Sequence, residues 1–160
     1  MTDRSVVHDS FSIERTYAAT PQRVFAAWAS REAKNQWFGE GDDFLATADQ
    51  YTLDFRVGGS ERLGGSFADG RSFDYHAVYH DIVADQRIVV SYDVRSDGRR
   101  VSVSLMTVEL VGVPEGTRVV LTEQGAFLDG LDSNDQRQEG AADSLDQLGA
   151  FLNAAALSQR

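Results

Sequence analysis

The chain has 160 residues, of which 42% are hydrophobic and 25% charged, and a formal net charge of −10. These values are typical of one globular unit, so we expect a single domain over residues 1–160, ordered from about residue 11 to residue 155. The negative charge disfavours nucleic acid and anionic membranes as partners, because phosphate groups would be repelled. The chain has no cysteine, which excludes disulfides and thiolate metal sites. It has no run of about eighteen apolar residues and no apolar secretion signal, so we expect a cytoplasmic protein without a membrane span.

The amino-terminal part of the chain is predicted to form a strand followed by two short helices. Residues 11–20 (FSIERTYAAT) alternate loosely between apolar and polar side chains and end at Thr20 and Pro21, a pair typical of a helix start. A first short helix follows, and residues 31–37 form a second one. The bend between the two helices should bring the chain's two tryptophans close together. The apolar face of the first helix carries Val24, Phe25 and Trp28.

From residue 51 to residue 124 the apolar residues recur with a period of two, which predicts an antiparallel meander. Turn signals separate the runs, and they are Gly58-Gly59, Asp69-Gly70, Asp97-Gly98 and Pro114-Glu115-Gly116. Two of the runs place every second side chain toward the core. These side chains are Tyr51, Leu53, Phe55, Val57, Ile88, Val90, Tyr92 and Val94.

The run from Val101 to Val111 is less regular, because its apolar phase changes between Leu105 and Met106. Either a β-bulge or a strand with two apolar faces explains this change. An outer face that carries Val101, Val103 and Leu105 would form an apolar patch, and such a patch predicts a homodimer.

A long amphipathic helix is predicted from Asn134 onward, with Ser133 and Gln136 in the spacing of a capping box. Such a helix has to cover a sheet. A curved sheet that grips the helix leaves a hollow between them unless side chains fill it completely. The apolar stripe of the helix consists of Ala141, Leu145, Leu148 and Leu152.

Several short motifs are spread along the chain. They are RTYAATPQRVFAAW at residues 15–28, Trp37-Phe38, VGGS at 57–60, GTR at 116–118, GAF at 125–127, and Glu139-Gly140 followed by Leu145. Together they resemble the START-like, SRPBCC helix-grip superfamily, and within it the branch similar to the carboxy-terminal domain of the activator of heat-shock-protein ATPase. The resemblance covers roughly residues 11–155 and implies an α+β fold in which a curved, seven-stranded antiparallel sheet wraps around the last helix. It also implies a cavity that relatives use for lipids, polyketides or other apolar molecules, although many bacterial members have no established reaction.

One position departs from the pattern of this family. Relatives often carry tryptophan after the glycine at the start of the final helix, whereas Gly140 is followed here by Ala141. If that indole normally fills the hollow, its absence either enlarges the cavity or lets another aromatic side chain move in.

The hollow is predicted to bind a small apolar or aromatic molecule. Trp28, Trp37 and Phe38 are large apolar side chains, and the indole N–H groups of the two tryptophans can meet one polar ligand atom. The alternative is that these rings only fill the core. The expected ligand-binding residues are Trp28, Trp37, Phe38, Phe55, Tyr75, Tyr79, Tyr92, Glu123, Phe127, Ala141, Leu145 and Leu148.

Glu123 is the ionisable residue of most interest, because it continues the apolar phase of its strand. If that phase faces inward, burial raises the pKa of the carboxyl and suits it to acid or base catalysis. The alternative is a solvated carboxylate at the end of a strand. A neighbouring strand presents one of two phases to the hollow, and the sequence leaves both open. The two phases are Phe73, Tyr75 and Tyr79, or His76, Val78 and His80.

The other residues that could bind a metal ion or a phosphate, or act as a nucleophile, do not form a known motif. His76 and His80 stand roughly 13 Å apart on a strand, too far to share a metal ion. The glycine-rich segment at 57–70 lacks the Gly-Lys-Ser/Thr of a phosphate loop, and no Gly-x-Ser-x-Gly elbow occurs. We expect neither a metal nor a cofactor. A polar cluster before the last helix is assigned to loop and cap contacts, and it contains Asp129, Asp132, Asn134 and Asp135.

Three functions fit these observations. The first is binding of a small apolar or aromatic molecule in the hollow. The second is an enzyme of the cyclase, hydratase or lyase type, in which Glu123, a tyrosine or a histidine transfers a proton. The third is a co-regulator of a chaperone ATPase, as the resemblance suggests.

Overall fold

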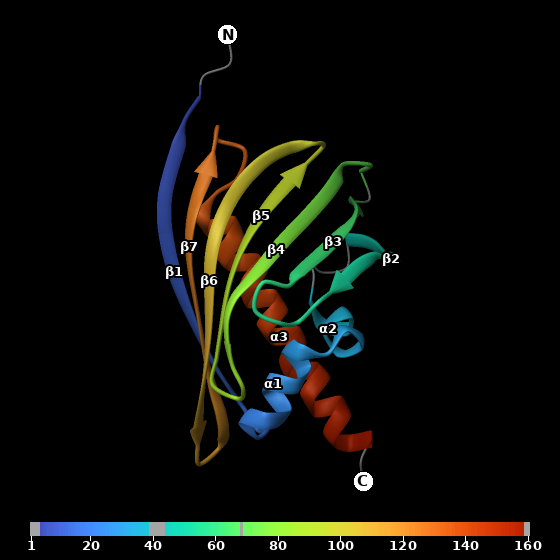
Figure 1. Cartoon of the computed structure of the whole chain (residues 1–160), viewed down its shortest axis with the longest axis vertical. Helices are drawn as coiled ribbons and strands as arrows, with labels where there is room; N and C mark the ends of the chain where they lie inside the picture. The colour runs from blue at the N-terminus through green and yellow to red at the C-terminus, as the bar shows by residue number, and fades with distance from the viewer. Residues whose placement is uncertain (1–3, 39–43, 68, 159–160) are drawn as a thin grey trace.

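A computed structural model of the protein describes residues 4–38, 44–67 and 69–158, with only the backbone described for 44–49, 67, 157 and 158. This part of the chain forms one seven-stranded antiparallel sheet and three helices. The sheet is curved, α3 runs along its concave side, and α1 and α2 lie near one end (Figure 1). The predicted α+β helix-grip fold is confirmed. The elements are β1 (Val6–Tyr17), α1 (Pro21–Ala29), α2 (Arg31–Trp37), β2 (Phe44–Leu53), β3 (Ser60–Phe67), β4 (Ser72–Val83), β5 (Arg87–Ser96), β6 (Arg99–Val113), β7 (Gly116–Leu128) and α3 (Asn134–Ser158).

The strand order in the sheet is β1-β7-β6-β5-β4-β3-β2. Strands β2 to β6 each pair antiparallel with the next strand along the chain, which confirms the predicted meander. Strand β1 pairs with the last strand, β7. Strands β1 and β2 are therefore the two edges of the sheet, and α1 and α2 connect one edge to the other across the concave side (Figure 1).

Local capping explains the two short helices. The Thr20 hydroxyl accepts a hydrogen bond from the Arg23 N–H at 3.3 Å, and Pro21 occupies the first turn of α1. The Ser30 hydroxyl caps α2 in the same way and accepts from the Ala33 N–H at 3.2 Å. Because the backbone of Ser30 is extended, the chain bends between the two helices, as predicted.

Two predicted strand boundaries need correction. Strand β1 begins at Val6, earlier than the predicted start at residue 11. Strand β2 ends at Leu53, so Val57 lies in the following turn and is 57% exposed instead of facing the core. The cause is Gly58, whose φ of +84° reverses the chain at this point.

A β-bulge at Val101 and apolar residues on both faces of the strand together account for the irregular run in β6, because the pairing continues regularly through Leu105 and Met106. The pairing of β5 with β6 shifts by one residue opposite residues 94–95, where Val101 is the extra residue. Val101 is buried, whereas Val103 and Leu105 point to the outer face and are 43% and 38% exposed. The outer patch thus lacks one of the three residues predicted for it, and dimerisation stays a prediction.

Helix α3 covers the concave face with the predicted stripe, because Leu145, Leu148 and Leu152 are buried. The Ser133 hydroxyl accepts from the Gln136 N–H at 3.2 Å, which is one half of the predicted capping box. Ser133 donates its own N–H to the Asp132 carboxylate at 2.8 Å, so Asp132 supplies the other half.

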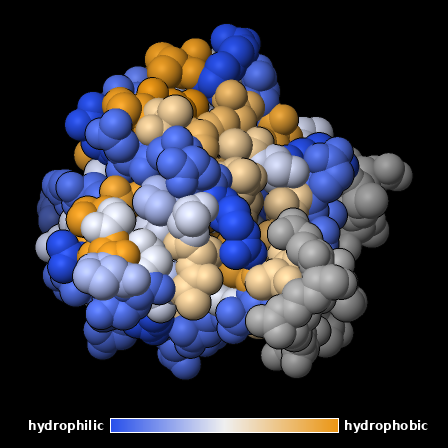
Figure 2. Space-filling view, turned by 90° about the horizontal axis from the view of Figure 1, so that it is seen from below, coloured by the Kyte–Doolittle hydropathy of each residue, from blue (hydrophilic) through white to orange (hydrophobic). Residues whose placement is uncertain are grey.

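The surface is mixed in character. Seen from the end that carries α1 and the carboxyl end of α3, hydrophilic residues surround small groups of apolar residues (Figure 2). None of the helices in the described part of the chain is both long and apolar enough to cross a membrane.

Candidate functional site

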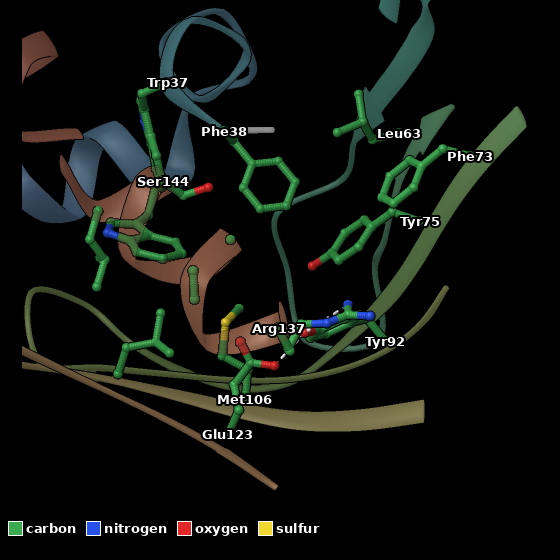
Figure 3. A pocket seen from close by; sticks show the side chains of 15 residues that line it. Trp37, Phe38, Leu63, Phe73, Tyr75, Tyr92, Met106, Glu123, Arg137 and Ser144 are labelled. Carbon is green, nitrogen blue, oxygen red and sulfur yellow. Dashed lines mark hydrogen bonds between the residues drawn. The ribbon is translucent and has the colours of Figure 1, made fainter. Parts of the chain in front are cut away.

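A partly enclosed cavity of about 70 Å³ lies between the sheet, α2 and α3 (Figure 3). An apolar cavity that binds benzene measures about 150 Å³, so a ring-sized molecule enters this one only if a wall side chain moves. The cavity is lined by Trp28, Trp37, Phe38, Leu63, Phe73, Tyr75, Tyr92, Met106, Leu121, Glu123, Arg137, Gly140, Ala141, Ser144 and Leu145.

Most of the residues predicted from the sequence meet at this cavity. Ala141 is among them, so the space beside this small side chain belongs to the cavity. Their contact with a ligand stays a prediction. The predicted residues that line the cavity are Trp28, Trp37, Phe38, Tyr75, Tyr92, Glu123, Ala141 and Leu145.

Four predicted residues lie elsewhere. The Phe55 ring packs edge-on against the Tyr79 ring at 5.1 Å, and the Tyr79 hydroxyl belongs to a separate buried cluster. Phe127 folds its ring over the backbone of Gly125, where an added Cβ would lie 2.8 Å from the ring. Leu148 is fully buried under α3. Tyr79, Phe127 and Leu148 share the inward phase of the cavity residues but sit further along their elements, and Phe55 lies in the turn after β2.

The two short helices and the residue that follows them supply three of the aromatic side chains that line the cavity. The Trp28 and Trp37 rings meet edge to face, with centroids 4.7 Å apart, and both side chains are buried. The Trp37 indole N–H donates to the Ala27 carbonyl at 3.1 Å, so it is not offered to a ligand as predicted. Phe38 follows at the end of α2, and its ring centroid lies 5.1 Å from that of Tyr75. The tryptophans therefore both fill the core and line the cavity.

A polar cluster lies at one side of the cavity. The Tyr92 hydroxyl donates to Oε1 of Glu123, and the Arg137 guanidinium lies 3.4 Å from the Tyr92 hydroxyl (Figure 3). Arg137 also donates to the Ser102 hydroxyl at 3.0 Å and forms an ion pair with Asp132. The charge of Arg137 is thus balanced by Asp132 outside the cavity wall.

The environment of Glu123 makes its carboxyl titrate near neutral pH. Burial raises the pKa of Glu123 from 4.5 to about 7, against the opposing effects of the Tyr92 hydrogen bond and the Arg137 charge. The side chain is only 4% exposed. The interpretation of Glu123 as a solvated carboxylate at a strand end is therefore wrong.

Tyr75 brings a second polar group into the cavity. Its side chain is 5% exposed and its hydroxyl points into the cavity (Figure 3). Among the described residues, this hydroxyl has no hydrogen-bond partner. Burial, followed by the charge of Glu61, raises the pKa of Tyr75 well above its usual value, so the group remains a neutral hydroxyl.

A second buried cluster lies behind the aromatic wall, and sequence reasoning missed it. The Lys34 ammonium lies 2.9 Å from the Glu61 carboxylate and 4.5 Å from the centre of the Phe38 ring. The hydroxyls of Tyr51 and Tyr79 donate to the same carboxylate at 2.7 Å and 2.8 Å. Four hydrogen-bonding groups thus satisfy one another where α2 meets the sheet.

The structure settles which phase of β4 faces inward. Tyr75 and Tyr79 are buried on the concave side, whereas the His80 ring bonds to the Ser91 hydroxyl at 2.7 Å outside. His76 lies on the same outer face and is 41% exposed. Within the described residues, no group of three or more His, Asp or Glu side chains is placed to hold a metal ion.

The polar segment before α3 makes loop and cap contacts, as predicted. The Asp129 carboxylate accepts from the Ser5 N–H at 2.9 Å, and the Asn134 amide donates to the Ser10 carbonyl at 3.1 Å. Asp132 does more than cap, because its second oxygen binds Arg137.

Arg137 and Ser144 are polar lining residues that sequence reasoning missed. A signal was present, since Arg137 precedes Ala141 by one helical turn and therefore shares the face of Leu145. Charged residues on an apolar stripe are usually placed at its solvent-exposed end, and Arg137 is instead held by Asp132 and Tyr92.

A curved antiparallel sheet that grips a long carboxy-terminal helix defines the START-like helix-grip class of proteins. Within this class, the family profile described as "Activator of Hsp90 ATPase homolog 1-like protein" matches residues 18–153. The chain belongs to this family. No curated protein matches the sequence.

Several solved structures are similar to this chain. An uncharacterized protein from Rhizobium leguminosarum is 42% identical with a TM-score of 0.90, and the match covers 96% of this chain and 99% of that one. The Mll3558 protein from Rhizobium loti is 44% identical with a TM-score of 0.84, covering 92% and 99%. The AHSA1 protein from Silicibacter pomeroyi is 22% identical with a TM-score of 0.76, covering 92% and 99%. At this last identity the likeness shows the fold alone.

Proposed function

We propose that the protein binds a small, largely apolar molecule in the cavity between the sheet, α2 and α3. The observation that carries the proposal is an aromatic-lined cavity that contains a buried, unpartnered hydroxyl and a carboxyl with a pKa near neutrality. A small number of polar groups that converge in an apolar cavity is typical of ligand-binding sites. The use of this space for apolar molecules is also what the superfamily resemblance implies.

The volume of the cavity limits the size of the molecule. Because the enclosed space is about 70 Å³, entry of one ring requires a wall to move. Phe38 is the suitable wall residue, since it is only partly buried and lies where α2 ends. A rotation of this ring enlarges the cavity and leaves the fully buried Leu145 on α3 in place.

The test uses toluene as the probe and compares the wild type with a variant in which a larger side chain fills the cavity. Toluene is expected to raise the thermal unfolding midpoint of the wild type, because a ligand that binds only the folded state stabilises it. The variant Ala141→Phe is expected to lose this response. The matched control Ala154→Phe makes the same change at an exposed position of α3 and is expected to keep it.

Circular dichroism verifies that both variants fold. Should Ala141→Phe be misfolded, amide chemical shifts of the wild type titrated with toluene locate the probe instead. The proposal is refuted if toluene has no effect on the wild type, or if the shifts map away from Phe38, Tyr75 and Ala141.

A second candidate function is proton transfer by Glu123. It is favoured by the pKa of about 7, which lets the carboxyl both take and give a proton at neutral pH. A molecule that binds in the cavity would be incubated in D₂O, and exchange of its carbon-bound protons followed by NMR. Exchange that persists in Glu123→Gln excludes Glu123 as the base. Regulation of a chaperone ATPase has only the words of the family description in its favour, and we do not propose it.

A further inference from the structure

Two residues that line the cavity carry a buried hydrogen-bonding group without a partner among the described residues, the indole N–H of Trp28 and the hydroxyl of Tyr75. The Tyr75 hydroxyl is buried, points into the cavity, and has no partner among the described residues (Figure 3). A buried hydroxyl without a partner is costly, so a polar atom of the bound molecule gains by pairing with it. Tyr75 therefore marks the place where that atom lies.

Glu123 offers a second contact at the same place. The rings of Tyr75 and Tyr92 are 4.8 Å apart, and Tyr92 donates to Oε1 of Glu123. A carboxylate has about four acceptor positions, so this hydrogen bond leaves room for another. Because the carboxyl titrates near neutral pH, the partner group has to suit both its ionised and its protonated form.

The charges around the cavity disfavour an ionic ligand. An anion would be repelled by Glu123 when it is ionised, and Arg137 is already paired with Asp132. A cation would meet Arg137, and the faces of the Phe38 and Trp28 rings are already occupied by the Lys34 ammonium at 4.5 Å and 5.2 Å. A neutral polar group avoids both costs.

We propose, on the basis of the function proposed above, that the bound molecule carries a hydroxyl group that lies between Tyr75 and Glu123. A hydroxyl both donates and accepts, so it pairs with Tyr75 and with either form of Glu123. The rest of the molecule is a small ring or short chain that lies among the aromatic side chains. The ligand class is thus a small neutral alcohol or phenol.

The test compares four single-ring probes that differ only in the substituent on the ring: toluene, phenol, benzoate and benzylamine. Dissociation constants are measured by calorimetry at pH 7 for the wild type and for Tyr75→Phe. Phenol is expected to bind the wild type about tenfold more tightly than toluene, as one well-formed hydrogen bond allows. In Tyr75→Phe the preference for phenol should shrink, because only the contact with Glu123 remains, and the constant of toluene should stay unchanged.

The control variant is Tyr17→Phe. It also removes one buried tyrosine hydroxyl, but this hydroxyl donates to the Leu145 carbonyl at 2.7 Å and lies outside the cavity lining. It should keep the preference for phenol. Tyr75→Phe is expected to fold normally, because it removes a group that has no partner.

The outcomes separate this inference from the proposed function. If toluene binds as tightly as phenol, or if benzoate or benzylamine binds more tightly than phenol, the hydroxyl assignment is overturned while the cavity still binds ligands. A preference for phenol that is as large in Tyr75→Phe as in the wild type also overturns it. If none of the four probes binds, both proposals fail.

Discussion

The ammonium of Lys34 lies 2.9 Å from the carboxylate of Glu61, and the two side chains are 1% and 0% exposed. The pair joins α2 to β3 directly behind the aromatic wall of the cavity. Removing two charges from water is expensive, and the arrangement is sustained by the hydrogen bonds that Tyr51 and Tyr79 donate to the same carboxylate. The integrity of the cavity wall therefore depends on a satisfied polar cluster.

The first prediction concerns loss of one partner. Lys34→Met leaves the Glu61 charge buried and unpaired, so the free energy of unfolding should fall by about 3–5 kcal/mol in urea titrations. The double variant Lys34→Met/Glu61→Gln should recover most of this loss, because no isolated charge remains. As a control, Arg56→Met breaks an exposed pair with Asp54 and should cost less than about 1 kcal/mol. A double variant as unstable as the single one would contradict this account.

The second prediction uses the fact that Lys34 is the only lysine of the chain. Because its amine is buried against Glu61, an amine-acylating reagent should modify Lys34 far more slowly in the native protein than in urea. Glu61→Gln weakens the attachment of α2 and should speed the modification. Peptide mass spectrometry after timed quenching measures both rates. Equal rates in native and unfolded samples would show that α2 does not protect the amine.

The third prediction follows from the raised pKa of Glu123. The folded pKa of about 7 exceeds the ordinary value of 4.5, so the folded state holds the proton more tightly than the unfolded state. This contribution to stability is complete below pH 4.5 and is lost as the pH rises through 7. Glu123→Gln cannot ionise and should therefore gain roughly 3 kcal/mol relative to the wild type between pH 4.5 and pH 8. Urea unfolding of both proteins across this range measures the difference, and a difference independent of pH would refute the assignment.

The fourth prediction compares two glycines with positive φ. Gly116 has a φ of +140°, and a Cβ there would lie 2.1 Å from the Tyr17 carbonyl oxygen, whereas Gly98, at +79°, has open space around it. Gly98→Ala should cost about 1 kcal/mol for the backbone conformation alone. Gly116→Ala should cost roughly 3 kcal/mol or more, because it also pushes β1 away from β7. Similar losses in thermal unfolding would show that the contact at Tyr17 relaxes easily.

Much of the fold followed from local patterns. The period-two runs predicted the strands, and Thr20, Ser133 and the spacing of Leu145 and Leu148 predicted the helices, because caps and side-chain periods depend only on neighbouring residues. The turn at Asp85 was missed, since its positive φ of 65° is adopted without a glycine. The sequence pattern also indicated that Glu123 shares the apolar face of its strand, but it did not show how deeply the carboxyl is buried.

The identity and spacing of residues thus determined which elements form and which face of each is apolar. Only the tertiary structure decided which polar groups meet, because contacts such as Lys34 with Glu61 and Tyr92 with Arg137 join residues 27 and 45 positions apart. It also decided that the Tyr79 hydroxyl bonds to a buried ion pair, whereas the Tyr75 hydroxyl, on the same face of the sheet, points into the cavity. That choice depends on strand register and on where α2 rests on the sheet, and neither is encoded by local periodicity.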